Sequence, residues 1–84
     1  MAYNVEYTSE LAGYESGSKS FDNVEDALYY AQDPLYSDIL EKNDDENLRR
    51  YQYLISNQLA DPIRCIELID ESGIVILSYD RITL

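Results

Sequence analysis

The fold is decided by the carboxyl-terminal stretch IRCIELI-DESG-IVILSY, which covers residues 63–79. Two apolar runs rich in β-branched residues, 63–69 and 74–79, flank the turn-forming residues DESG. This arrangement predicts a β-hairpin in which Gly73 takes the left-handed turn position. Residues 74–77 lack polar alternation, so we expect the second strand of the hairpin to lie centrally in a sheet.

The amino-terminal part predicts the strands that complete this sheet. Residues 3–8 alternate Tyr, Val and Tyr with polar residues, which is the period of a half-buried strand. A turn at residues 11–13 leads to a serine-rich segment, 14–21, which we expect at an edge of the sheet.

Between these strands the pattern predicts two or three helices. The first begins at Asp22, whose side chain can accept a hydrogen bond from the Glu25 amide. It ends near Gln32, because the ring of Pro34 cannot continue a helix. Pro34 can itself open a short second helix or a single helical turn. The apolar side of the first helix is expected to carry Val24, Ala27, Leu28 and Ala31.

A third helix is expected from a cap at Asn43 to Pro62, with acidic residues in its first turn. The element order is then β-β-α-α-α-β-β. This order predicts an α+β fold, in which two to three helices pack on one face of an antiparallel sheet of three to four strands. The length of the chain predicts that residues 1–84 form a single domain.

The composition limits the class of protein further. A hydrophobic fraction of 45% is too high for a disordered acidic tail. One cysteine, Cys65, and no histidine leave no internal disulfide and no histidine-containing zinc site. We expect Cys65 to be a small buried side chain in a strand. With no signal peptide or membrane span, the sequence predicts a soluble, cytoplasmic protein.

The charge is large and unevenly distributed. The formal net charge is −11, and residues 1–46 hold twelve acidic and two basic side chains. Residues 47–84 hold five acidic and four basic side chains and are close to neutral. A negative surface opposes direct binding to nucleic acid or an anionic membrane, so a basic protein is the expected partner.

The motifs that could indicate catalysis or metal binding also have simpler structural interpretations. Without histidine, the usual base of a serine or cysteine nucleophile is absent. Residues 17–20, GSKS, resemble the end of a phosphate-binding loop, but their glycine spacing favours a polar turn or edge strand. The carboxylate pairs and triplets could bind calcium or magnesium, but helix starts explain them without a metal. We therefore expect no catalytic centre, no metal and no cofactor.

The remaining candidate is an acidic surface between residues 22 and 46. Carboxylates at intervals along helices could occupy the basic channel of a nucleic-acid-binding protein, and exposed tyrosines could supply apolar anchors. Of the other tyrosines, Tyr3, Tyr7 and Tyr51 are expected in the core, and Tyr53 on the surface. The predicted partner-binding residues are Asp22, Glu25, Asp26, Tyr29, Tyr30, Asp33, Tyr36, Asp38, Glu41, Asp44, Asp45 and Glu46.

In length, charge and helix-plus-sheet pattern the chain resembles small acidic inhibitors of phages and mobile elements. These are the DNA mimics, the anti-CRISPR and anti-restriction proteins and the uracil-DNA glycosylase inhibitors. The resemblance implies a non-catalytic inhibitor that blocks the basic surface of a nucleic-acid-processing protein, as a monomer or a homodimer. The alternative is a regulatory or immunity-type subunit that binds a partner through a tyrosine-rich face or an exposed strand edge.

Overall fold

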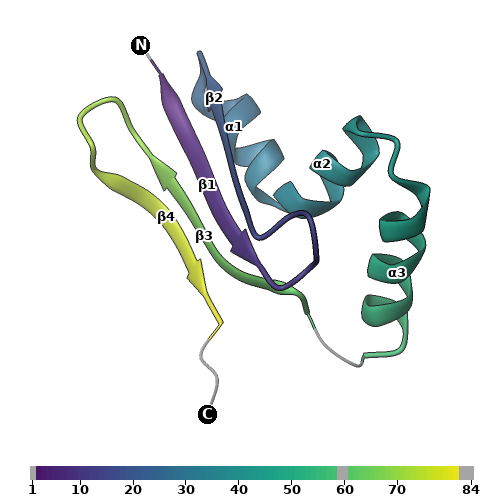
Figure 1. Cartoon of the computed structure of the whole chain (residues 1–84). Helices are drawn as coiled ribbons and strands as arrows, with labels where there is room; N and C mark the ends of the chain where they lie inside the picture. Colours follow the sequence, from purple (N-terminus) through teal and green to yellow (C-terminus); the bar gives the residue numbers. More distant parts are fainter. Residues whose placement is uncertain (1, 59–60, 82–84) are drawn as a thin grey trace.

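The computed structural model describes residues 2–58 and 61–81, and its elements follow the predicted order β-β-α-α-α-β-β. The strands are β1 (Tyr3–Ser9), β2 (Ser16–Phe21), β3 (Ile63–Ile69) and β4 (Val75–Asp80), and the helices are α1 (Val24–Ala31), α2 (Pro34–Glu41) and α3 (Asp45–Ser56). The strands form one antiparallel sheet in the order β2-β1-β3-β4 (Figure 1). The predicted α+β class is thus confirmed.

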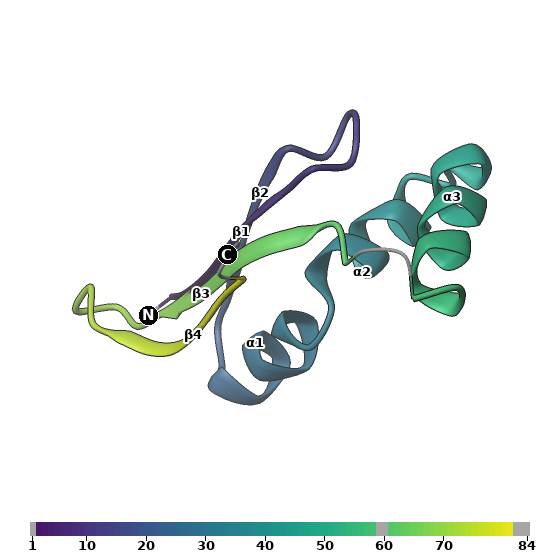
Figure 2. The same ribbon diagram turned by 90° about the horizontal axis from the view of Figure 1, so that it is seen from below.

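The helices form a layer on one side of the sheet. Helix α1 packs against β1, β2 and β3, and α2 packs against β1 and carries α3 on its other side (Figure 2). None of these helices is long and apolar enough to cross a membrane. The buried core lies between the sheet and the helices: Val5, Tyr7, Leu11, Tyr14, Ala27, Tyr30, Ala31, Leu35, Ile39, Tyr51, Ile63, Ile66 and Leu68.

The prediction that the last strand is central is wrong. β4 pairs with β3 alone, and all six of its residues are exposed. The central strands are β1 and β3, which alternate buried and more exposed side chains because only their helix-facing side is covered. An unbroken apolar run does not distinguish a strand buried on both faces from an uncovered edge strand.

Four local predictions are also corrected. Asn23, not Asp22, caps α1 by accepting from the Asp26 amide at 2.8 Å. Asp44, not Asn43, caps α3, because Asn43 adopts a positive φ of 53° in the preceding turn. Helix α3 ends at Ser56, before Pro62, and Leu28 lies on the exposed side of α1.

The turns and the first edge strand agree with the sequence. Gly13 and Gly73 both have positive φ, as their turns require. β2 is a polar edge strand, and the GSKS segment at residues 17–20 lies within it. Cys65 was expected to be a buried side chain in a strand. It lies in strand β3, but its side chain is only half-buried.

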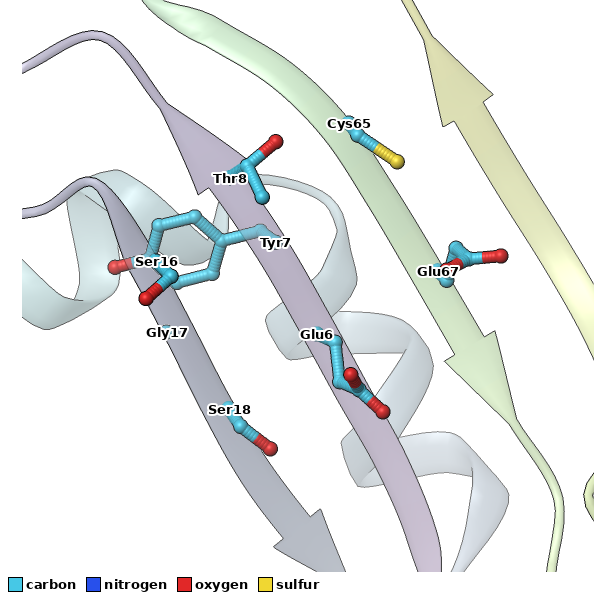
Figure 3. Close-up of a pocket in the computed structure, with 8 residues that line it drawn as sticks. All are labelled: Glu6, Tyr7, Thr8, Ser16, Gly17, Ser18, Cys65 and Glu67. Atoms are coloured by element: carbon cyan, nitrogen blue, oxygen red, sulfur yellow. The ribbon is translucent and has the colours of Figure 1, made fainter.

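Gly17 is required for close packing between β1 and β2. A Cβ at this position would lie 2.6 Å from Cζ and 2.8 Å from the hydroxyl of Tyr7 (Figure 3). Because that ring is buried, Gly17→Ala is expected to lower the free energy of unfolding by about 1–3 kcal/mol in urea denaturation. Ser18→Ala, one residue along the same strand, should change it by less than about 0.5 kcal/mol. Equal effects of the two changes would mean that the Tyr7 ring moves aside freely.

Candidate protein-binding surfaces

The predicted acidic surface divides into carboxylates that hold the fold together and carboxylates that face solvent. Asp38, in the middle of α2, belongs to the first kind. It accepts a hydrogen bond from the Tyr7 hydroxyl and another from the Tyr30 hydroxyl, both at 2.7 Å. Since Tyr7 lies on β1 and Tyr30 on α1, this one carboxylate joins three elements of the core.

Two more of the predicted binding residues have the same internal role. Asp33 caps α2 and accepts from the Tyr51 hydroxyl of α3 at 2.6 Å. Asp44 caps α3 and accepts from the Tyr14 hydroxyl at 3.1 Å. Hydrogen bonds from the side chain and backbone of Asn47 hold the pKa of Asp44 below its usual value. These half-buried carboxylates stabilise the positions of the helices.

Burial explains why the tyrosines donate to carboxylates. Loss of solvent, and then the hydrogen bond to Asp38 or Asp33, raises the pKa of Tyr7, Tyr30 and Tyr51 far above the ordinary value for a phenol. Each phenol therefore keeps its proton and remains a donor. Much of the high tyrosine content serves the core.

The expected tyrosine-rich face is not formed. Tyr30 is buried, so its placement on the surface is wrong, and Tyr36 is half-buried with its ring centroid 6.0 Å from that of Tyr51. Tyr29 is 77% exposed on α1, and Tyr53 is exposed on a different helix, α3. The exposed tyrosines are therefore scattered, and the carboxylates are the better candidate for recognition.

Six exposed carboxylates remain, in two groups. Helices α1 and α2 form the arms of a V in Figure 1, with one group near the open end of each arm. We call these the α1 acidic group (Asp22, Glu25 and Asp26) and the α2–α3 acidic group (Glu41, Asp45 and Glu46). Among the described residues, Glu41 is the one member that forms an ion pair, with Lys19 at 3.0 Å.

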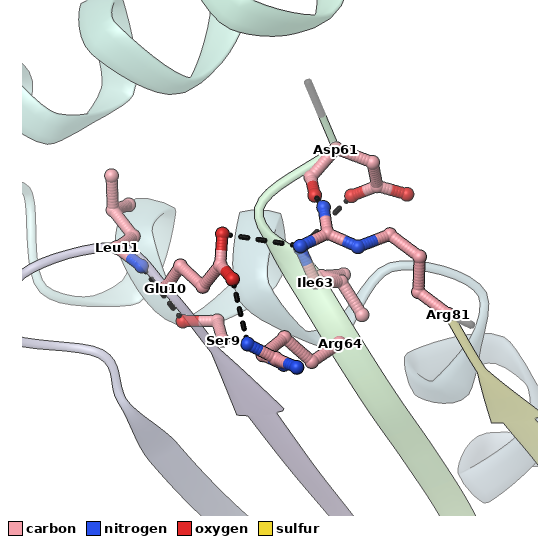
Figure 4. Close-up of polar contacts among 7 residues, drawn as sticks. All are labelled: Ser9, Glu10, Leu11, Asp61, Ile63, Arg64 and Arg81. Carbon is pink, nitrogen blue, oxygen red and sulfur yellow. Dashed lines mark hydrogen bonds and ion pairs between the residues drawn. The ribbon is translucent and has the colours of Figure 1, made fainter. Parts of the chain in front are cut away.

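Basic side chains gather elsewhere, around Glu10. Arg64 and Arg81 bind its two carboxylate oxygens at 2.8 and 3.1 Å, and Arg81 also donates to the Asp61 carbonyl (Figure 4). The hydrogen bond from Arg81, strengthened by the charge of both guanidinium groups, lowers the pKa of Glu10. This cluster uses two of the chain's six basic side chains at the end of the sheet.

A shallow depression lies on the face of the sheet away from the helices. Side chains of Glu6, Thr8, Cys65 and Glu67 surround it, together with serines of β2 (Figure 3). Burial, and then the charges of Glu67 and Asp80, raises the pKa of the Cys65 thiol, which disfavours the nucleophilic thiolate. Within residues 2–58 and 61–81, no group of three His, Cys, Asp or Glu side chains could hold a metal ion.

The surface that the sequence analysis missed is β4. The exposed fractions of Val75, Ile76, Leu77 and Tyr79 are 45%, 48%, 43% and 39%. The run of apolar residues was visible in the sequence, but its position at the edge depends on the order in which the strands pair. The chain therefore has two distinct candidate surfaces, one acidic and one apolar.

Comparisons with protein-family models, with curated proteins and with solved structures find no match to this chain.

Proposed function

We propose that this chain is a non-catalytic inhibitor, acting in the cytoplasm, that occupies the basic surface of a nucleic-acid-binding or nucleic-acid-processing protein. The observation that carries the proposal is the pair of exposed acidic groups on short, internally braced helices. Five of their six carboxylates have no ion pair among the described residues. The helices that carry these carboxylates are held in place before binding, so less entropy is lost when a basic channel meets them.

The internal tyrosine hydrogen bonds support this role. They hold α2 and α3 in place through Asp33, Asp38 and Asp44, so the α2–α3 acidic group rests on braced helices. Charge of one sign on such a surface speeds encounter with an oppositely charged partner and competes with the phosphates of its substrate. The regulatory-subunit alternative loses its tyrosine-rich face, because Tyr30 is buried and Tyr29 and Tyr53 are on separate helices.

The proposal predicts that partner capture depends on these carboxylates and on salt. A variant with Asp22→Asn, Glu25→Gln, Asp26→Asn, Asp45→Asn and Glu46→Gln should lose at least about tenfold in affinity at low salt. Asp33, Asp38 and Asp44 are left unchanged because replacing them would disturb the fold. The wild-type chain and this variant serve as baits in a lysate, and proteins retained by the wild type alone are eluted with a salt gradient.

A captured protein must then be tested with its nucleic acid. The proposal expects the purified wild-type chain to displace nucleic acid from that protein and the amide variant to fail. Circular dichroism of both baits is the control for folding. If the two baits retain the same proteins, or if the captured protein keeps its nucleic acid, the acidic surface is not the inhibitory site.

A further inference from the structure

The two edges of the sheet differ in a way that points to a partner for β4. Edge strand β2 carries serines, Gly17 and Lys19, which are typical of an edge that stays in solvent. Edge strand β4 has the sequence VILSYD, with no basic residue and no proline. An exposed apolar edge strand is a template for pairing with another strand.

The hydrogen-bond pattern shows which backbone groups of β4 are available. The Arg81 amide donates to the Arg64 carbonyl at 2.7 Å. In an antiparallel ladder hydrogen-bonded and non-hydrogen-bonded pairs alternate, so Tyr79 is bonded to β3, whereas Ser78 and Asp80 are not. The amide and carbonyl groups of Ser78 and Asp80 therefore point toward the free edge.

We propose that β4 pairs antiparallel with β4 of a second copy of this chain, with the two-fold axis at Ser78. In this register the free amide and carbonyl of Ser78 bond to those of Ser78 in the other copy. Leu77 of each copy then lies opposite Tyr79 of the other, on the helix side of the sheet. Pairs of an aromatic and an apolar side chain directly across a strand pair are stabilising, so Leu77 and Tyr79 cover one another. The result is one continuous sheet with twice the four strands of each copy.

The charge distribution permits a second copy at this edge. Asp80 is the sole charged residue of β4, and in the proposed register it lies opposite Ile76, so the two Asp80 carboxylates do not face each other. The α2–α3 acidic group is carried on the other side of the molecule (Figure 1). A basic partner would find little to bind at β4, whereas an identical strand matches its Leu77 and Tyr79 on the helix side of the sheet.

The small size of the β4–β4 contact limits the expected stability of the dimer. A standard interface involves about 20–30 residues on each side, and a strand of six residues provides fewer. We therefore expect a concentration-dependent equilibrium between monomer and dimer. Sedimentation equilibrium should show a species of about twice 9.7 kDa at high concentration and no larger species, because the polar β2 edge ends the assembly.

Proline substitutions at matched positions test the pairing. Ser78→Pro removes a free-edge amide without removing a bond to β3, and should raise the dimer dissociation constant by at least about tenfold. Ser18→Pro is the control, because its amide points to the free edge of β2 by the same alternation from Ser9, which donates to Glu15 at 2.9 Å. Ser18→Pro should leave dimerisation unchanged. A monomeric wild type, assembly beyond a dimer, or a larger effect of Ser18→Pro would each overturn the proposal.

Two further variants keep the test decisive if Ser78→Pro unfolds. Leu77→Lys puts a charge opposite Tyr79 and should also give a monomer, with unchanged circular dichroism. Ser78→Cys, in a chain that also carries Cys65→Ser, should cross-link two copies under mild oxidation, because Cα atoms in such a pair lie about 5.5 Å apart. A dimer that tolerates Leu77→Lys and does not cross-link through residue 78 uses another surface. The amide variant of the acidic groups should still dimerise, so this test is independent of the proposed inhibitory function.

Discussion

Replacing Asp38 by alanine is expected to lower the free energy of unfolding by about 2–5 kcal/mol, because the hydroxyls of Tyr7 and Tyr30 lose their shared acceptor. Both rings are buried, and a buried hydroxyl that loses its acceptor is costly. A domain of this size has little stability in reserve, and the melting temperature should fall by at least about 10 °C. Urea denaturation and calorimetry measure the two quantities.

A matched control exists on the same helix. Glu41 is exposed and pairs with Lys19 at the surface, so Glu41→Ala should cost less than about 1 kcal/mol. A second comparison tests the cause. Adding Tyr7→Phe and Tyr30→Phe to Asp38→Ala removes the donors together with the acceptor and should recover part of the lost stability. If the effects of the three changes on the free energy of unfolding were simply additive, the hydroxyls would have other partners. The Asp38 carboxylate would then not connect these elements.

The sequence predicts well those features that depend on neighbouring residues. The hairpin of β3 and β4, the positive φ of Gly73 and the end of α1 before Pro34 all follow from local conformational limits. The helix caps were misplaced by one residue because Asp22 and Asn23, and likewise Asn43 and Asp44, are adjacent residues that can both cap.

Features that depend on distant contacts were not predictable in this way. Asp38 lies 31 residues from Tyr7, and no local pattern indicates that their side chains meet. The charge imbalance pointed to the carboxylates between residues 22 and 46 as a group, and only tertiary packing separates the internal ones from the exposed ones. For β4, the apolar run was clear, but its edge position follows from the pairing of β3 with both β1 and β4.

The same tyrosine–carboxylate contacts predict unfolding at alkaline pH. Tyr7, Tyr30 and Tyr51 have pKa values in the folded state that lie well above the unfolded value of about 10. Below that pH both states keep the phenol proton, and the stability from these groups is fully present. As the pH rises further, the unfolded state releases protons that the folded state retains, so stability falls.

The free energy of unfolding is expected to fall steeply as the pH rises above about 10, the pKa of tyrosine in the unfolded state. Each tyrosine lowers the free energy of unfolding by about 1.4 kcal/mol per pH unit above its unfolded pKa, so the three together lower it by about 4 kcal/mol per unit. A domain with about 5–8 kcal/mol of stability should then unfold cooperatively near pH 11–12. Far-ultraviolet circular dichroism and tyrosinate absorbance should change together at that midpoint.

Alkaline unfolding could also come from general charge repulsion, because the chain has a net charge of −11. Two comparisons separate this repulsion from the ionisation of the buried tyrosines. Added salt screens repulsion between surface carboxylates but leaves the proton difference of a buried phenol in place, so the steep pH dependence should persist at high salt. Tyr51→Phe removes one linked proton, and the slope of the free energy of unfolding against pH should fall by about 1.4 kcal/mol per pH unit. If the absorbance of all nine tyrosines rose while the circular dichroism stayed constant, the buried hydroxyls would ionise in the folded protein. Their hydrogen bonds to Asp33 and Asp38 could then not be the contacts that brace the acidic helices.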